Sequence, residues 1–172
     1  MRIPPLKIAV VGASLGGLSA ANVLSQLGFE VHVFEVYAKG FEQRGGALGS
    51  VDIKLLRQIR GSDTDGADRT IKGHGHFYGD LWEYLYQGLP KESVHFGIEV
   101  QTIIDEKTDQ PALMMNGATT AFDLIIGADG GKSTVRQFVT DQVPIYSGYT
   151  VWRGLVPMRG IDRPPSGFKV VN

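Results

Sequence analysis

The stretch VVGASLGGLSA, residues 10–20, decides the fold, because it joins an apolar strand pattern to a helical one. The run that leads into it, Lys7–Val11, is apolar and rich in β-branched residues, which is typical of a buried parallel strand. A helical pattern follows over 15–27, and Gly28 stands where a helix end favours a left-handed residue. Residues 30–35 then indicate a second strand, so this segment is predicted to be a βαβ unit.

The turn between the first strand and the helix has the chemistry of a dinucleotide site. A helix N-terminus offers unpaired backbone N–H groups and a partial positive charge, which suit a pyrophosphate. Gly12 permits the tight turn, and Gly17 permits close packing of the helix on the strand. Ser14 occupies the place of the middle glycine in this pattern, but its hydroxyl can donate to a phosphate oxygen. The serine weakens the motif without removing it.

Glu35 ends the second predicted strand and discriminates among dinucleotides. A carboxylate here accepts hydrogen bonds from a ribose 2′-OH and repels a 2′-phosphate. The expected ligand is therefore FAD or NAD rather than NADP. A plain βαβ unit with incidental glycines remains the alternative, since a glycine fingerprint alone is a weak signal.

Further elements follow along the chain. The predictions are a short helix over 52–60, a polar loop over 61–76, a helix over 80–88, a strand within 93–104, strands over 112–115, 119–122 and 124–126, a helix from about 133, and a strand over 149–156. The two strands that flank Asn116-Gly117 form a predicted hairpin, because this dipeptide is a strong turn signal.

A second motif, FDLIIGADGGKSTVR, covers residues 122–136. A buried strand pattern runs into a glycine turn, and Ser133 is a suitable N-cap for a following helix. Asp129 would lie at the carboxyl end of the strand, where open α/β sheets bind ligands. Taken alone, the same residues also fit an ordinary strand–turn–helix connection with Asp129 in a turn role.

This second motif resembles the FAD fingerprint of the flavin-dependent aromatic hydroxylases, the group that contains p-hydroxybenzoate and salicylate hydroxylases. Two other stretches are similar to the same family, RGGAL at 44–48 and YSGYTVWRGL at 146–155. The resemblance implies an α/β fold: a Rossmann-like FAD-binding βαβ unit with a β-meander over 1–145, then the start of a substrate-domain sheet over 146–172. Against the family pattern, this second domain is truncated and the third flavin motif is expected beyond residue 172.

The resemblance also implies which residues bind the cofactor. The implied FAD-binding residues are Gly12, Ser14, Leu15, Gly17, Glu35, Val36, Arg44, Val100 and Asp129. The residues of the first turn would hold the pyrophosphate, and Glu35 the adenosine ribose, with Val36 beside it. Arg44 would approach from its loop, and Val100 would lie near the adenine. Arg136 either supports the second motif or contacts a pyridine nucleotide, or it is a solvated charge on a helix.

The implied activity is that of a monooxygenase that hydroxylates an aromatic or N-heteroaromatic ring, with FAD as cofactor and NAD(P)H and O₂ as co-substrates. No side chain is assigned as catalytic, because the cofactor carries the chemistry. Two alternatives remain open: an NAD-binding oxidoreductase without flavin, and a non-catalytic dinucleotide-binding remnant. The expected partner is a small aromatic substrate, and a homodimer is one assembly that the resemblance allows.

The composition of the chain excludes several classes of partner and site. The chain has 172 residues, a net charge of −1 and no cysteine, so we expect no nucleic-acid partner and no redox-active thiol pair. His74 and His76 lie in a glycine-rich segment without a clear third ligand, so no metal site is predicted. Trp82, Tyr84 and Tyr86 are expected to pack in the core. No stretch has the roughly 20 apolar residues of a membrane span, and a soluble cytoplasmic protein is expected.

Overall fold

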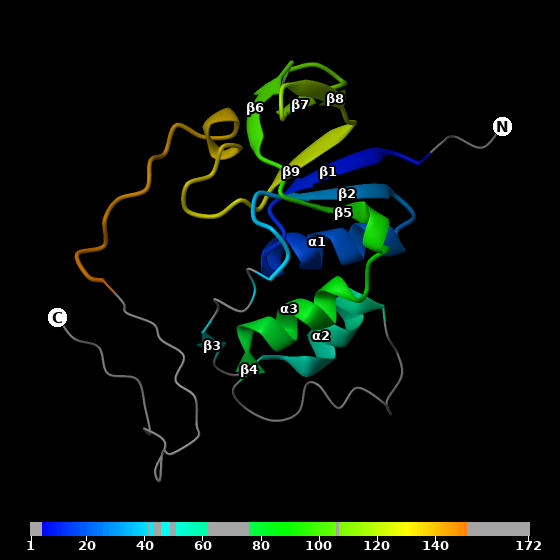
Figure 1. The fold of residues 1–172 in the computed structure, drawn as a ribbon, viewed down its shortest axis with the longest axis vertical. Coiled ribbons are helices and arrows are strands. Elements are labelled where there is room, and N and C mark those ends of the chain that lie inside the picture. The colour runs from blue at the N-terminus through cyan, green and yellow to red at the C-terminus, as the bar shows by residue number, and fades with distance from the viewer. Residues whose placement is uncertain are drawn as a thin grey trace, which may run out of the picture. The chain divides into compact units, whose positions relative to one another are not determined.

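The computed structural model describes residues 5–40, 42, 46–48, 51–61, 76–105 and 107–150, and its centre is a parallel four-stranded sheet (Figure 1). The strand order is β5-β2-β1-β9, with bounds Val94–Phe96, Glu30–Glu35, Lys7–Val11 and Leu124–Gly127. Ile8, Ala9 and Val10 of β1 are at most 1% exposed, because both faces of the sheet are covered. Burial on both faces explains why β1 is continuously apolar, whereas a strand with one exposed face would alternate apolar and polar residues.

Three α-helices of the described residues lie on one side of this sheet (Figure 1): α1 (Leu15–Gln26), α2 (Ile53–Arg60) and α3 (Tyr78–Tyr86). The core between the helices and the sheet includes Leu18 and the fully buried Trp82. Tyr84 and Tyr86 belong to the same core, which confirms the predicted packing role of the α3 aromatic residues.

An antiparallel sheet covers the other face of the parallel sheet, and consists of β6 (Val100–Ile104), β7 (Ala112–Met115) and β8 (Ala118–Ala121). The turn between β7 and β8 has positive φ at Asn116 (50°) and Gly117 (79°), as a two-residue hairpin turn requires. A second core that includes Leu113 and Phe122 fills the space between the two sheets. The predicted βαβ unit and β-meander are confirmed.

One predicted segment holds more than was expected and another holds less. The segment 93–104 contains the predicted strand and a second one: β5 and β6 lie in different sheets and are separated by Gly97, with a left-handed φ of 71°. The helix expected from Ser133 is only a 3₁₀ turn, η3 (Arg136–Phe138). The Asp129 carboxylate accepts the N–H groups of Thr134 and Val135 before this turn. The turn does not extend into a helix because a short helix is stabilised mainly by packing of an apolar face, and Val139 and Val143, which would continue it, are exposed.

The remaining elements are short. A two-stranded antiparallel pair is formed by β3 (Ala47–Leu48) and β4 (His76–Phe77), and η2 covers Lys91–Ser93. Helix α2 begins after Asp52, whose side chain accepts the Leu55 N–H at 3.1 Å. The predicted polar loop lies outside the described residues from 62 to 75, as does the predicted strand 149–156 beyond residue 150.

The chain divides into two units, Met1–Gln142 and Val143–Asn172. All the helices and strands above belong to the first unit, and residues 143–150 of the second form neither. The predicted domain boundary at 145/146 stays a prediction. Within the described part of the chain, no helix is long and apolar enough to cross a membrane.

Candidate dinucleotide-binding site

A cleft of about 450 Å³ opens at the carboxyl ends of β1, β2 and β9. Its lining residues are Val11, Gly12, Ser14, Phe34, Glu35, Val36, Tyr37, Tyr78, Ile98, Glu99, Val100, Ala128, Asp129, Gly130, Lys132 and Thr134. This is the edge at which parallel α/β sheets bind ligands, because the loops after neighbouring strands meet there. Six of the predicted FAD-binding residues line the cleft: Gly12, Ser14, Glu35, Val36, Val100 and Asp129.

Glycine is required at two places in the first turn. Gly12 has a φ of 101°, and a Cβ atom there would clash with the backbone of Ala128. A Cβ atom on Gly17 would clash with the carbonyl oxygen of Gly12. The two glycines therefore let the turn, α1 and the second loop approach one another. Gly17 and Leu15 support the turn without lining the cleft.

Ala13, at the centre of this turn, is held by hydrogen bonds from two other elements. Its N–H donates to a carboxylate oxygen of Glu35 at 2.8 Å, and its carbonyl accepts the indole N–H of Trp82 at 2.6 Å. The neighbouring Gly12 N–H donates to the carbonyl of Phe34 at 2.7 Å. The shape of the turn is therefore fixed by β2 and α3 as well as by its own sequence.

Glu35 is a buried carboxylate, 5% exposed, that reaches the cleft from the end of β2. Its second oxygen accepts the N–H of Tyr37 at 3.0 Å. A carboxylate has about four lone-pair positions, so these two backbone bonds leave acceptor capacity for ligand hydroxyls. Val36, beside it, is exposed, whereas Val100 on the opposite wall is buried.

Ser14 is the N-cap residue of α1, yet its side chain makes no capping hydrogen bond. Its hydroxyl instead lies 2.8 Å from the hydroxyl of Tyr78, the first residue of α3. The usual bond from the N-cap side chain to the N2 or N3 N–H is therefore not made. The sequence analysis missed this contact, and also the bond from Trp82 to Ala13, because each joins residues more than 60 positions apart.

The second loop is organised mainly by its own side chains. Asp129 accepts hydrogen bonds from the Ser133 hydroxyl at 2.5 Å, the Thr134 N–H at 2.6 Å and the Val135 N–H at 3.2 Å. The Arg136 guanidinium donates to the carbonyl oxygens of Gly130 and Gly131, both at 2.9 Å. Arg136 therefore supports this loop from a 3₁₀ turn, and it is not a free charge on a helix.

The charges around the cleft are mostly negative. Glu35, Glu99 and Asp129 line it, and Lys132 is the cationic side chain among the described lining residues. This balance disfavours a further phosphate near Glu35, as the sequence predicted. Arg44 and His74 lie outside the described residues, as does the side chain of His76.

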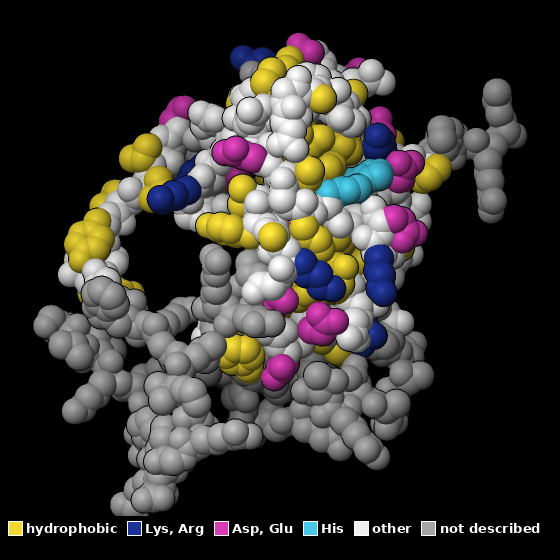
Figure 2. Space-filling model, viewed as in Figure 1, with side chains coloured by type: hydrophobic (Ala, Val, Ile, Leu, Met, Phe, Trp, Pro, Cys, Tyr) yellow, Lys and Arg dark blue, Asp and Glu magenta, His cyan; other side chains and the backbone are white. Residues whose placement is uncertain are grey.

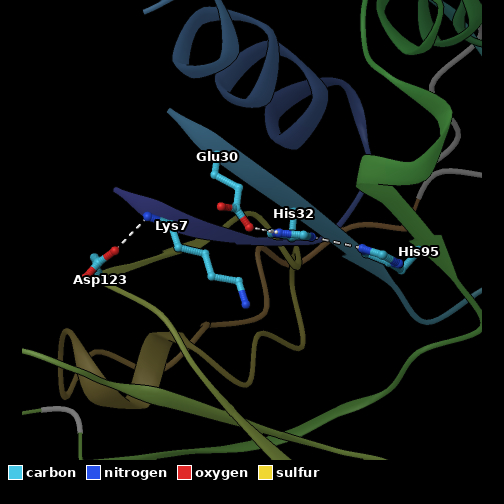
Figure 3. A network of polar contacts seen from close by, with 5 residues as sticks. All are labelled: Lys7, Glu30, His32, His95 and Asp123. Carbon is cyan, nitrogen blue, oxygen red and sulfur yellow. Dashed lines mark hydrogen bonds and ion pairs between the residues drawn. The ribbon is translucent and has the colours of Figure 1, made fainter. Parts of the chain in front are cut away.

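A separate polar cluster lies on the sheet face that carries the second core. Histidine side chains form one strip on the surface in Figure 2, and Figure 3 shows the rings of His32 and His95 pointing toward each other. The Nδ1 of His32 and the Nε2 of His95 are 3.2 Å apart. His32 also contacts the Glu30 carboxylate at 2.9 Å. Burial and the neighbouring His32 lower the pKa of His95.

The fold is Rossmann-like and its cleft has the chemistry that suits a dinucleotide, and comparison with known proteins narrows the class of protein. The chain is 30% identical to 6-hydroxynicotinate 3-monooxygenase from Pseudomonas fluorescens, over 88% of the chain and 48% of that protein. It is 33% identical to 3-amino-4-hydroxybenzoate 2-monooxygenase from Streptomyces cremeus, over 88% of the chain and 46% of that protein. A third relative, 26% identical over 92% of the chain and 46% of its own length, is an FAD-dependent monooxygenase from Monascus ruber.

Solved structures agree on the fold. The 2,6-dihydroxypyridine-3-hydroxylase from Arthrobacter nicotinovorans superposes with a TM-score of 0.71 at 23% identity, over 84% of this chain and 42% of that one. The sequence predicts a resemblance to this enzyme from Ser14 and the stretch Tyr78–His95. No family model matches the chain.

These matches confirm the resemblance that the motif over 122–136 and the stretches 44–48 and 146–155 indicated: the homologues of this chain are FAD-dependent aromatic monooxygenases. The chain spans about half the length of the curated relatives that it matches.

Proposed function

We propose that this chain binds FAD in the cleft and serves a monooxygenase that hydroxylates an aromatic or N-heteroaromatic ring with NAD(P)H and O₂. One observation carries the proposal: a buried carboxylate, Glu35, and Ser14, the N-cap residue of α1 whose side chain does not cap the helix, line the same cleft. A ribose hydroxyl needs such an acceptor, and a pyrophosphate needs such donors. The homology to FAD-dependent aromatic monooxygenases supports the choice of cofactor.

The residues present fit this cofactor. In the proposal, Gly12, Ser14, Leu15 and Gly17 hold the pyrophosphate through the backbone of the turn, whose close packing a Cβ atom on either glycine would disrupt. Glu35 binds the ribose, and Val36 and Val100 offer apolar surface to the adenine. Asp129 keeps its loop open beside the diphosphate, with Arg136 bracing that loop. When bound, FAD would supply the redox chemistry of the hydroxylation.

The proposal also covers the reductant, the substrate, the location, the assembly and one further cofactor contact. We propose NAD(P)H as the reductant, a small aromatic substrate, a cytoplasmic location and a homodimer, and we propose Arg44 as a further cofactor contact. The substrate class follows from the names of the relatives, which act on hydroxylated pyridine and benzoate rings.

The visible spectrum of the purified chain tests the cofactor directly. We expect flavin absorption, and chromatography of the material released by heat should yield FAD. A colourless chain that takes up no added FAD but binds NAD would instead favour an oxidoreductase without flavin. For the activity, NAD(P)H oxidation coupled to a hydroxylated product is the expected result, and oxidation without any ring product would contradict it.

A further inference from the structure

The strongest unexplained feature of the cleft is a serine at a helix N-cap that does not cap its helix. Ser14 has extended backbone angles, φ −77° and ψ −179°, as an N-cap residue requires. An N-cap serine ordinarily accepts a hydrogen bond from the N2 or N3 N–H, here Gly16 or Gly17. In this chain its hydroxyl is engaged by Tyr78 at 2.8 Å instead.

Tyr78 is held firmly enough to impose this arrangement. It begins α3, and its own N–H donates to the carbonyl of Gly46 at 2.9 Å. One helical turn further along α3, Trp82 is fully buried and donates to Ala13 at 2.6 Å. Residues four apart lie on the same face of a helix, so this face of α3 contacts two consecutive residues of the turn.

We infer that Tyr78 is a positioning residue, which holds the Ser14 hydroxyl away from α1 and so leaves the first-turn N–H groups of α1 open to a diphosphate. This inference rests on the proposed function, because the ligand is the diphosphate of FAD. Without the tyrosine hydroxyl, Ser14 would cap its own helix and compete with the ligand for the same donors. A serine at position 14 is then compatible with diphosphate binding only because the Tyr78 hydroxyl hydrogen-bonds to it.

If Tyr78 acts through Ser14, the effect of removing its hydroxyl depends on the Ser14 hydroxyl. If Tyr78 instead contacted the ligand directly, the effect would be the same with or without that serine. Tyr78→Phe should weaken FAD binding about fivefold, the amount that a typical N-cap bond represents. In a chain that also carries Ser14→Gly, no hydroxyl is left to compete, so the same tyrosine substitution should change the affinity less than twofold. The four chains are compared by equilibrium titration with FAD.

A second measurement needs no cofactor. Amide hydrogen exchange of Gly16 and Gly17, followed by NMR in the chain without FAD, should slow when Tyr78→Phe frees Ser14 to cap α1. It should return to the original rate when Ser14→Gly is added. Equal weakening by Tyr78→Phe in both backgrounds, no weakening in either, or unchanged amide exchange would overturn the inference. If the parent chain binds no FAD, the proposed function fails, while the exchange experiment still decides the role of Tyr78.

Discussion

The two loops that form the cleft are built in opposite ways. The turn after β1 is held from outside: Glu35 of β2, Trp82 of α3 and the Phe34 carbonyl bind its backbone. The loop after β9 is held from within, because Asp129 and Arg136 bind groups at most six residues away. The difference teaches that the first turn depends on the whole fold, whereas the second is a nearly self-sufficient motif.

The largest expected effect comes from filling the point where the two loops meet. Gly12→Val would place a side chain against the backbone of Ala128 at a φ of 101°, so we expect a loss of at least about 3 kcal/mol in the free energy of unfolding. Urea denaturation measures it. Gly16→Ala is the matched control, since a Cβ atom there meets nothing within 4 Å. Equal stability of both variants would contradict the close approach of the loops.

Removing an external support should damage the first turn from a distance. Trp82→Phe leaves the Ala13 carbonyl without its buried donor and opens a small cavity, for an expected loss of about 2–3 kcal/mol. Hydrogen exchange should show faster exchange in the turn around residues 12–14. If faster exchange is confined to α3, the hydrogen bond from Trp82 does not hold the turn after β1.

Breaking the second loop should have a smaller and more local effect. Asp129→Asn replaces one acceptor oxygen with a donor that faces backbone N–H groups, so we expect a loss of about 1–2 kcal/mol. The same exchange experiment should show changes confined to residues 129–138. Faster exchange in the first turn would mean that the two loops are coupled more tightly than their hydrogen bonds indicate.

The sequence could predict the parts of the site that depend on neighbouring residues, and not those held by distant ones. The Asp129 loop, the Asn116-Gly117 hairpin and the βαβ unit depend on neighbouring residues, so their patterns were informative. The contact of Ser14 with Tyr78 joins residues 64 positions apart, and no periodicity encodes it. The helix predicted from Ser133 stops at a 3₁₀ turn for a related reason, since Val139 and Val143, which would continue it, are exposed and tertiary packing is not encoded in the local pattern.

The smallest expected effect is on the pH dependence of stability, and it comes from the pair His32 and His95. This pair lies outside both loops. The pKa of His95 is lowered by burial and then by His32, so the folded chain binds fewer protons than the unfolded chain. Stability should be complete above pH 6.5, the ordinary value, and fall as the pH drops through the lowered pKa. Glu30 contacts the other ring of the pair, His32, at 2.9 Å.

Urea midpoints between pH 5 and 8 measure this slope, and His95→Gln should flatten it. An unchanged slope in that variant would assign the pH dependence to other groups.

The most direct test of the central claim is the FAD affinity of two variants with a single neutralised carboxylate in the same cleft. Glu35→Gln should weaken binding roughly tenfold or more, because a buried charged acceptor for the ribose is lost. Glu99→Gln, which also lines the cleft, should change the affinity less than about twofold. Equal effects of the two substitutions, or no FAD binding by the parent chain, would contradict the assignment of this cleft to the cofactor.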